Sequence, residues 1–355
     1  MDTTTVQIFD GPGQPLRREA WPIPEALQDG EVLVGIALAT ICGSDLHTVS
    51  GQRTEPTPAI LGHEAVGRVL RKGRGRPELA EGTRVTWSIA DSCGRCPACT
   101  EFGLPQKCDA LFKYGHAAVT NGSGLNGCYA GHILLRAGTH IVPVPDNVSD
   151  PMAAPINCAL ATMVNALSYV PAPCRTAVIQ GAGMLGLYGA ALLRDRGADA
   201  VFCVDVQEGR LELAESFGAT PIDGRPGRYE QARARIEQAA PRGVDAVIEV
   251  AGKADLVPEG VRLLRPGGHY AFIGMVHPNS ALPLTGEAVI RKCLTIHGTH
   301  NYGPEHLDEA VAFLARTVDA YPYESLVSAP YRLDEIESAL DAARSQQWAR
   351  VAVAP

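Results

Sequence analysis

Two patterns of hydrophobic and polar positions divide the chain near residue 151. Before this point, short apolar runs are separated by glycine, proline and polar turn residues, a pattern typical of irregular β structure. We therefore expect a mostly β domain here. The runs that predict its strands are residues 31–38, 65–70 and 132–135.

After residue 151, apolar strand-like runs alternate with segments of helical period, which predicts a doubly wound parallel sheet. A helix at 159–169 comes first. The predicted strands are 176–180, 200–205, 244–249 and 269–273, and the predicted helices run to about 196 and over 209–217 and 229–240.

The C-terminal part carries two further helical periods, at 305–317 and 334–345, and an apolar run at 350–353. We expect this last strand to return to the first domain. The chain is thus predicted to be an α/β protein, with one domain formed by 1–152 and 296–355 and a second by 153–295.

Composition limits the classes of function. Of 355 residues, 46% are hydrophobic and 20% are charged, and the net charge of −8 argues against a nucleic-acid partner. No apolar run reaches the roughly 20 residues of a membrane helix, and the N-terminus does not resemble a signal peptide. We therefore expect no membrane partner and a cytoplasmic location. Because a reducing compartment disfavours disulfides, the ten cysteines indicate metal binding or burial.

A glycine-rich turn follows the predicted strand 176–180 and opens the next helix. Gly181, Gly183 and Gly186 have the G-x-G-x-x-G spacing of a dinucleotide-binding loop, in which the helix N-terminus receives the pyrophosphate. Asp205 ends the next strand, where a carboxylate accepts hydrogen bonds from the adenosine ribose and repels a 2′-phosphate, so NAD is favoured over NADP. The alternative is a generic α/β domain with a glycine-rich turn. The predicted cofactor-binding residues are Gly181, Gly183, Met184, Leu185, Gly186, Asp205 and Arg210.

Four cysteines lie close together in the first domain. Cys93, Cys96 and Cys99 are spaced C-x-x-C-x-x-C and Cys108 follows, with small, polar or turn-forming residues between them. Four thiolates suit a tetrahedral structural zinc and leave no open position for a substrate. An iron–sulfur cluster and idle thiols are the alternatives. The scattered remainder are predicted to be structural: Cys128, Cys174, Cys203 and Cys293.

Three more residues form a second possible metal set: Cys42 in the segment 42–47, His63 in Gly62-His63-Glu64, and Cys158. One histidine and two cysteines are a ligand set of catalytic zinc, which keeps its fourth position for water or substrate. Spacing alone does not bring these residues together.

The order of these motifs resembles the zinc-containing medium-chain alcohol dehydrogenase family, which includes the alcohol, threonine and polyol dehydrogenases. The resemblance covers nearly the whole chain; the gap from Cys99 to Cys108 is one residue longer than the usual family spacing. It implies a GroES-like catalytic domain, a Rossmann domain and two zinc ions per chain. The implied ligands are Cys42, His63 and Cys158 for catalytic zinc, and Cys93, Cys96, Cys99 and Cys108 for structural zinc.

The resemblance also implies roles beside the catalytic metal. Glu64 approaches the metal during ligand exchange, and Asp45 orients His63. Zinc lowers the pKa of the alcohol, and hydride passes to the nicotinamide. Ser44 accepts the alcohol proton by hydrogen bond, and His47 passes it to solvent. For Ser44 and His47 the alternatives are a helix-capping serine and a surface histidine.

The resemblance implies that the substrate is a primary or secondary alcohol. Trp87 is a candidate pocket residue, and Lys113 and His116 are candidates for binding an anionic group. The segment around them loosely resembles a subgroup of the family associated with phosphonate metabolism; a surface loop is the alternative. Family habit implies a homodimer or homotetramer. Two other functions compete: a zinc-independent quinone or enoyl reductase of the same fold, and a non-catalytic NAD-binding protein.

Overall fold

The structure is a computed structural model that describes residues 2–277 and 279–355. The chain forms two compact units. Unit 1 comprises Met1–Cys158, Tyr302–Val318 and Tyr323–Pro355, and unit 2 comprises Ala159–Asn301 and Asp319–Pro322. The strand β16 (Thr295–Gly298) therefore lies in unit 2.

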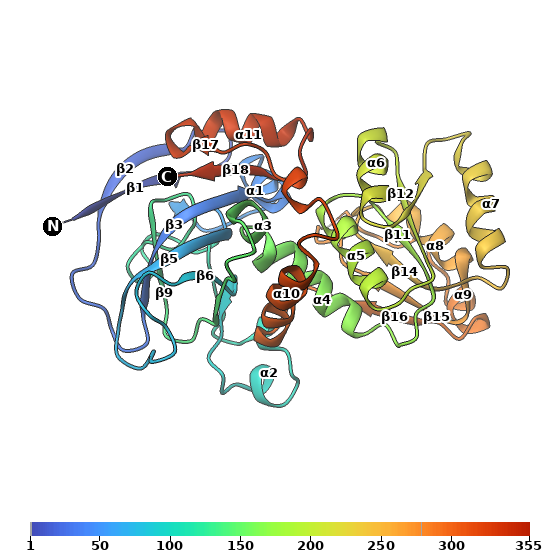
Figure 1. The fold of residues 1–355 in the computed structure, drawn as a ribbon, viewed down its shortest axis with the longest axis horizontal. Helices are drawn as coiled ribbons and strands as arrows, with labels where there is room; N and C mark the ends of the chain where they lie inside the picture. The colour runs from blue at the N-terminus through green and yellow to red at the C-terminus, as the bar shows by residue number, and fades with distance from the viewer. Residues whose placement is uncertain (1, 278) are drawn as a thin grey trace. The chain divides into compact units, whose positions relative to one another are not determined.

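Unit 1 is built mainly from β-strands (Figure 1). Its largest sheet has seven strands in the order β10-β6-β5-β3-β18-β17, with β9 also paired to β3, and a smaller sheet has the order β2-β1-β4. These strands are β1 (Thr3–Phe9), β2 (Arg17–Pro22), β3 (Val32–Ile41), β4 (Ala59–Ile60), β5 (Glu64–Lys72), β6 (Arg84–Trp87), β9 (His132–Leu135), β10 (Ile141–Pro143), β17 (Tyr331–Arg332) and β18 (Val351–Ala354).

The remaining elements of unit 1 are short, apart from two C-terminal helices. A two-stranded ladder of β7 (Ala90–Asp91) and β8 (Phe112–Lys113) lies next to the cysteine-rich segment. The helices are α1 (Gly43–Val49), α2 (Pro97–Thr100), η1 (Pro105–Lys107), α3 (Asp150–Ala153), α10 (Pro304–Thr317), η4 (Tyr323–Leu326), η5 (Leu333–Glu335) and α11 (Ile336–Arg344), and the π-helix η2 (Ile156–Leu160) ends unit 1 and begins unit 2.

The C-terminal strand completes the large sheet of unit 1. Val351 in β18 pairs antiparallel with Ile41 in β3, which confirms the predicted return of this segment to the first domain. Ile36, Ile41 and Val351 are buried in one apolar core with Ile336 and Leu340 of α11. The sheet thus joins residues from both ends of the chain.

Unit 2 contains a six-stranded parallel sheet in the order β13-β12-β11-β14-β15-β16 (Figure 1). The order reverses between β11 and β14, which is where ligands bind in open α/β sheets. Its elements are α4 (Ala161–Ser168), β11 (Thr176–Gln180), α5 (Met184–Asp195), β12 (Ala200–Asp205), α6 (Glu208–Ser216), β13 (Thr220–Asp223), α7 (Tyr229–Ala239), β14 (Val244–Glu249), η3 (Ala254–Leu256), α8 (Val257–Leu263), β15 (Leu264–Phe272), α9 (Gly286–Arg291) and β16.

Helices cover both faces of this sheet. Val178 of β11 packs with Ile236 of α7 and Val257 of α8, whereas the neighbouring Ile179 faces α5. Strand side chains alternate between faces, so a central strand covered on both sides is apolar throughout, as the run 177–179 is. The predicted combination of a mostly β domain and a doubly wound parallel sheet is confirmed.

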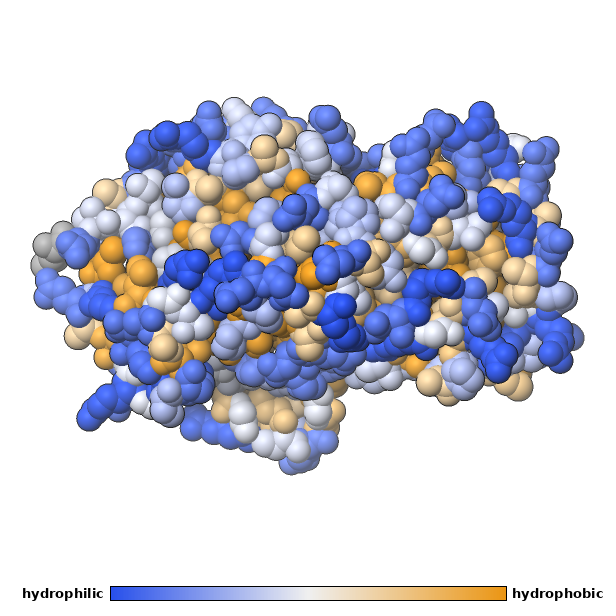
Figure 2. Space-filling view, in the orientation of Figure 1, coloured by the Kyte–Doolittle hydropathy of each residue, from blue (hydrophilic) through white to orange (hydrophobic). Residues whose placement is uncertain are grey.

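The surface is polar over most of the face drawn in Figure 2, with smaller hydrophobic areas between hydrophilic side chains. Among the described residues, none of the helices is long and apolar enough to cross a membrane.

Candidate active site

One group of possible metal ligands is assembled from three separate parts of unit 1. Cys42 links β3 to α1, His63 and Glu64 stand at the start of β5, and Cys158 lies in the π-helix η2. One ligand atom from each of these four residues lies within 4.8 Å of the others. Two thiols and an imidazole are a donor set that zinc favours, so the residues present fit this metal.

Asp45 is positioned to orient His63. Its Oδ2 accepts a hydrogen bond from the backbone N–H of Cys42 at 2.9 Å, and its Oδ1 lies 3.5 Å from His63 Nδ1. Burial by itself would lower the pKa of His63, but Asp45 and Cys42 outweigh burial and raise this pKa to about 10. With Nδ1 turned toward Asp45, Nε2 is the ring nitrogen left for a metal.

A buried ion pair lies beside these ligands. Arg350, just before β18, donates from Nε to Glu64 Oε2 at 2.7 Å and from Nη2 to Oε1 at 2.9 Å. Its Nη2 is also 3.7 Å from Cys42 Sγ. Burial raises the pKa of Glu64 in spite of this partner, and a hydrogen bond from Cys158 lowers the pKa of Cys42. Sequence reasoning missed Arg350, since no motif marks it.

Asn157 fixes the backbone around the ligands. Its buried Nδ2 donates to the carbonyl of His63 at 3.0 Å and to that of Trp87 at 2.9 Å. Trp87 itself is completely buried in the apolar core of unit 1. The one sequence feature that could have marked Asn157 is its position next to the predicted ligand Cys158.

Ser44 and His47 both lie on α1. Cys42 is the N-cap of α1 and Ser44 is its second residue, so Ser44 does not cap this helix. His47 is exposed, and its Nδ1 lies 2.6 Å from Gln52 Oε1. Because this amide oxygen only accepts hydrogen bonds, Nδ1 carries the proton and Nε2 is free to accept another.

A further group of polar side chains reaches the ligands through His116. The rings of His116 and His63 have centroids 5.1 Å apart. Glu55 Oε1 lies 3.0 Å from His116 Nδ1 and 2.5 Å from Arg53 Nε. Burial lowers the pKa of His116 to about 4, and it also lowers the pKa of Lys113. Glu55 and Arg53 belong to no recognisable motif, and sequence reasoning missed both.

The segment 93–108, called the cysteine lobe below, brings its four cysteines together, Cys108 included. Their sulfur atoms lie within 4.8 Å of one another, and Cys96 Sγ is 3.5 Å from Cys99 Sγ and 3.8 Å from Cys108 Sγ. Tetrahedral zinc with Zn–S bonds of about 2.3 Å separates its sulfurs by about 3.8 Å. The N–H groups of Cys93 and Ala110 point to Cys108 Sγ at 3.2 and 3.3 Å. These residues therefore fit a zinc ion.

The glycine-rich loop of unit 2 joins β11 to α5. A Cβ added to Gly186 would lie 2.0 Å from the carbonyl oxygen of Gly181, whereas a Cβ on Gly183 would have no atom within 4 Å. Gly186 thus permits close packing of helix on strand, while the space in front of Gly183 is open. Gly183 is the N-cap of α5, Met184 is its first residue and Leu185 follows, so the open space lies at a helix N-terminus suited to a phosphate.

Asp205 ends β12 beside this loop. Its Oδ2 accepts from the N–H of Ala182 at 2.8 Å, and its Oδ1 accepts from the N–H groups of Val206 and Gln207 at 2.8 and 3.0 Å. Arg210 lies 3.8 Å from the same carboxylate. The carboxylate is therefore held in a fixed place at the end of the strand.

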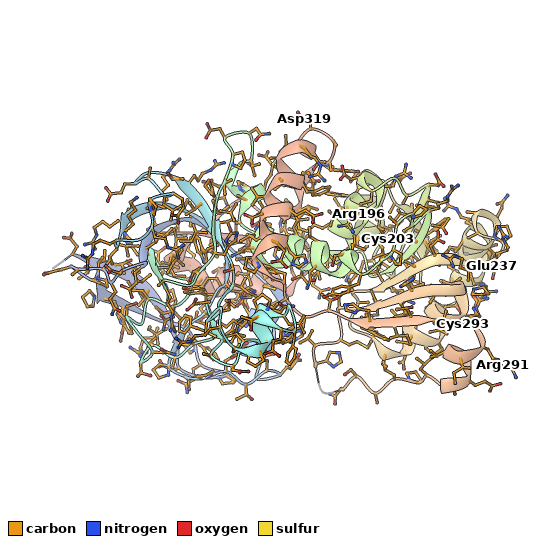
Figure 3. The ribbon with its side chains drawn as sticks, turned by 90° about the horizontal axis from the view of Figure 1, so that it is seen from below. Arg196, Cys203, Glu237, Arg291, Cys293 and Asp319 are labelled. Atoms are coloured by element: carbon orange, nitrogen blue, oxygen red, sulfur yellow. The ribbon has the colours of Figure 1, made fainter. Side chains whose placement is uncertain are left out.

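The remaining cysteines do not join either group of ligands. Cys203 is buried in β12 of unit 2 and Cys293 is exposed (Figure 3). Burial raises the pKa of Cys203, Cys174 and Cys128, which leaves these thiols protonated at neutral pH.

Comparison with known proteins points to the same family of dehydrogenases that the sequence motifs resemble. Residues 28–146 match the alcohol dehydrogenase GroES-like domain, and residues 185–316 match the zinc-binding dehydrogenase domain. A 5-exo-hydroxycamphor dehydrogenase from Pseudomonas putida is 31% identical over 92% of both chains.

Solved structures agree with these matches. An alcohol dehydrogenase from Thermotoga maritima has a TM-score of 0.94 and 29% identity, covering 100% of both chains. A putative zinc-binding dehydrogenase from Sinorhizobium meliloti, bound to NADP, has a TM-score of 0.85 and 25% identity, again over 100% of both chains. The fold, the ligand groups and these matches lead to one conclusion: the chain belongs to the family of zinc-binding alcohol dehydrogenases.

Proposed function

We propose that the chain oxidises an alcohol with NAD and holds two zinc ions, a catalytic one at Cys42, His63 and Cys158 and a structural one at the four cysteines of the lobe. The observation that carries the proposal is the proximity of these donor atoms, each group within 4.8 Å, in a member of this family. A zinc-independent reductase has no need of the first group.

When bound, zinc polarises the alcohol oxygen and NAD accepts the hydride. The side chains of the chain itself do the rest. Asp45 holds the imidazole of His63, and Arg350 keeps the Glu64 carboxylate beside the ligands, ready to approach the metal during ligand exchange. Ser44 accepts the alcohol proton, and the free Nε2 of exposed His47 takes it toward solvent.

NAD is proposed over NADP because of Asp205. Its carboxylate is held by three backbone N–H groups at the end of β12, where it accepts hydrogen bonds from ribose hydroxyls and repels a 2′-phosphate. Arg210 is the nearest cation to this carboxylate in the ion pairs described. The proposed loop contacts to the pyrophosphate come from Gly183, Met184 and Leu185.

The proposed assembly is a homodimer or homotetramer in which unit 2 contacts a second copy of the chain. Strand β16 stands at the edge of the six-stranded sheet, and Ile296 in this strand is 37% exposed. Exposed apolar edge strands are prone to pair with another chain, and a second copy is the partner that family habit implies. Light scattering should give a mass of two or four times 37.6 kDa.

Metal content and activity test the proposal together. The purified protein should contain two zinc ions per chain and reduce NAD, rather than NADP, with at least one member of a panel of primary and secondary alcohols. Cys42→Ala should lose both one zinc ion and the activity. The matched control is Cys174→Ala, since Cys174 belongs to neither ligand group.

Two results would contradict this function. Alcohol oxidation that persists at the wild-type rate in Cys42→Ala would remove the catalytic role of the first ligand group. A protein that binds NAD but oxidises nothing in the panel would favour the non-catalytic alternative.

A further inference from the structure

The ammonium group of Lys113 is a half-buried cation without a bonded counter-charge. Lys113 lies in β8, which pairs with β7, and His116 donates its backbone N–H to the Lys113 carbonyl at 3.3 Å. Among the described residues, the Lys113 side chain has no hydrogen bond and no ion pair. Removing an ammonium from water without such a partner is costly.

The surroundings of Lys113 place it at the proposed catalytic centre. It interacts electrostatically with the thiols of Cys42 and Cys158 and with Arg53 and Glu55. The only carboxylate of this set, Glu55, is already bound by His116 and Arg53. Zinc with two thiolate ligands carries no net charge, so a loaded site leaves Lys113 without compensation from the cysteines.

His116 does not supply a second donor. The Glu55 carboxylate accepts from His116 Nδ1, so that nitrogen carries the proton of a neutral ring. Its Nε2 is then a hydrogen-bond acceptor, which repels an oxyanion. Arg53 adds positive charge nearby, but its Nε is bound to Glu55.

We propose that the Lys113 ammonium binds an oxyanion group on the substrate, so that the alcohol oxidised by this chain carries a carboxylate, phosphate or phosphonate. This inference rests on the proposed function, because the alcohol must reach the ligand group of Cys42, His63 and Cys158. The anion restores the partner that Lys113 lacks within the protein.

The test compares anionic and neutral alcohols in the zinc-loaded protein. The probes are 3-hydroxypropionate, 2-hydroxyethylphosphonate and the neutral 1-propanol, each with NAD. Lys113→Met, which keeps most of the unbranched stem but removes the ammonium, should raise KM for at least one anionic probe about ten- to a hundredfold, the size of one lost charge-assisted hydrogen bond, and leave KM for 1-propanol unchanged. Lys113→Arg should restore most of the loss.

A binding measurement without turnover accompanies the kinetics. Propionate and ethylphosphonate lack the hydroxyl group, and in calorimetric titrations without NAD at least one should bind the wild type but not Lys113→Met. Whichever anion is preferred identifies the substrate as a carboxylate or a phosphorus oxyanion. Lys107→Met, which removes an exposed lysine of the cysteine lobe, is the matched control.

The anion site at Lys113 and the dehydrogenase function on which it rests can fail independently. If 1-propanol is oxidised but Lys113→Met changes the KM of all three alcohols equally, the anion site is wrong and the dehydrogenase stands. Equal binding of both anions to the wild type and to Lys113→Met overturns the site as well. If no alcohol is oxidised and zinc is absent from Cys42, His63 and Cys158, the proposed function has failed.

Discussion

Gly183, the N-cap of α5, and Gly186, in the first turn of this helix, are expected to respond differently to substitution. A substitution at Gly186 tests packing, and one at Gly183 tests cofactor binding. In Gly186→Ala the new Cβ would lie 2.0 Å from the carbonyl oxygen of Gly181, and Cβ atoms essentially never approach within 3.0 Å. The carbonyl must therefore retreat by about 1 Å from a tightly packed turn. In Gly183→Ala the new methyl group meets no protein atom within 4 Å.

The expected free energies differ accordingly. Overpacking of this kind costs about 2–3 kcal/mol, which lowers the melting temperature of a unit of this size by about 4–12 °C. Gly183→Ala replaces only the N-cap residue of α5 and should lower the free energy of unfolding by about 1 kcal/mol or less. It nevertheless fills the space proposed for the pyrophosphate, and one lost charge-assisted hydrogen bond weakens NAD binding about tenfold or more.

The assay is thermal unfolding of the zinc-loaded proteins without cofactor, followed by titration with NADH monitored by its fluorescence. Gly186→Ala should be the less stable variant, and Gly183→Ala should be near wild type in stability but weak in NADH binding. Wild-type NADH affinity in Gly183→Ala would refute the pyrophosphate site. An unchanged melting temperature in Gly186→Ala would refute the packing argument.

Two further predictions concern unit 1. Arg350→Met leaves the buried Glu64 carboxylate without its cation and should lower the free energy of unfolding by about 3–5 kcal/mol; the double variant with Glu64→Gln should recover part of this loss in denaturant titrations, and additive losses would contradict the coupling. Burial lowers the pKa of His132, whose Nδ1 lies 2.8 Å from Thr4 Oγ1. Since the unfolded state then binds the proton more readily, the stability from neutral His132 is complete above about pH 6.5 and is lost as pH falls toward the folded-state pKa. Between pH 7.5 and 5.5, the wild type should therefore lose more stability than His132→Asn, and equal losses would show that this histidine does not titrate differently on folding.

The elements with strong periodicity were predictable from the sequence. Residues 200–205 form β12 and residues 132–135 form β9 at the predicted positions. Strand β13, with the sequence Thr-Pro-Ile-Asp, and β16, with Thr-Ile-His-Gly, were not predicted. Each has four residues and one strong apolar position, and what stabilises it is pairing with a neighbouring strand.

The candidate site was predictable where its residues lie in a motif. The four cysteines of the lobe are close in sequence, and the glycines follow a strand directly. Cys42 and Cys158, by contrast, are brought together only by the fold, so their association was inferred from family resemblance. Arg350 and Glu55 act through pairs with partners 286 and 61 residues away. Such long-range pairs leave no trace in local periodicity.

The pairing of Glu64 with Arg350 has a consequence for the order of events during synthesis. Cys42, His63, Glu64 and Cys158 have all left the ribosome long before residue 350 is translated, and β3 has no β18 to pair with until then. A nascent chain therefore exposes a pair of thiols, an imidazole and an uncompensated carboxylate to the cell. A metal ion that binds at this stage binds to a site that still lacks Arg350. The Glu64 carboxylate gains its permanent partner only after the last strand has been synthesised.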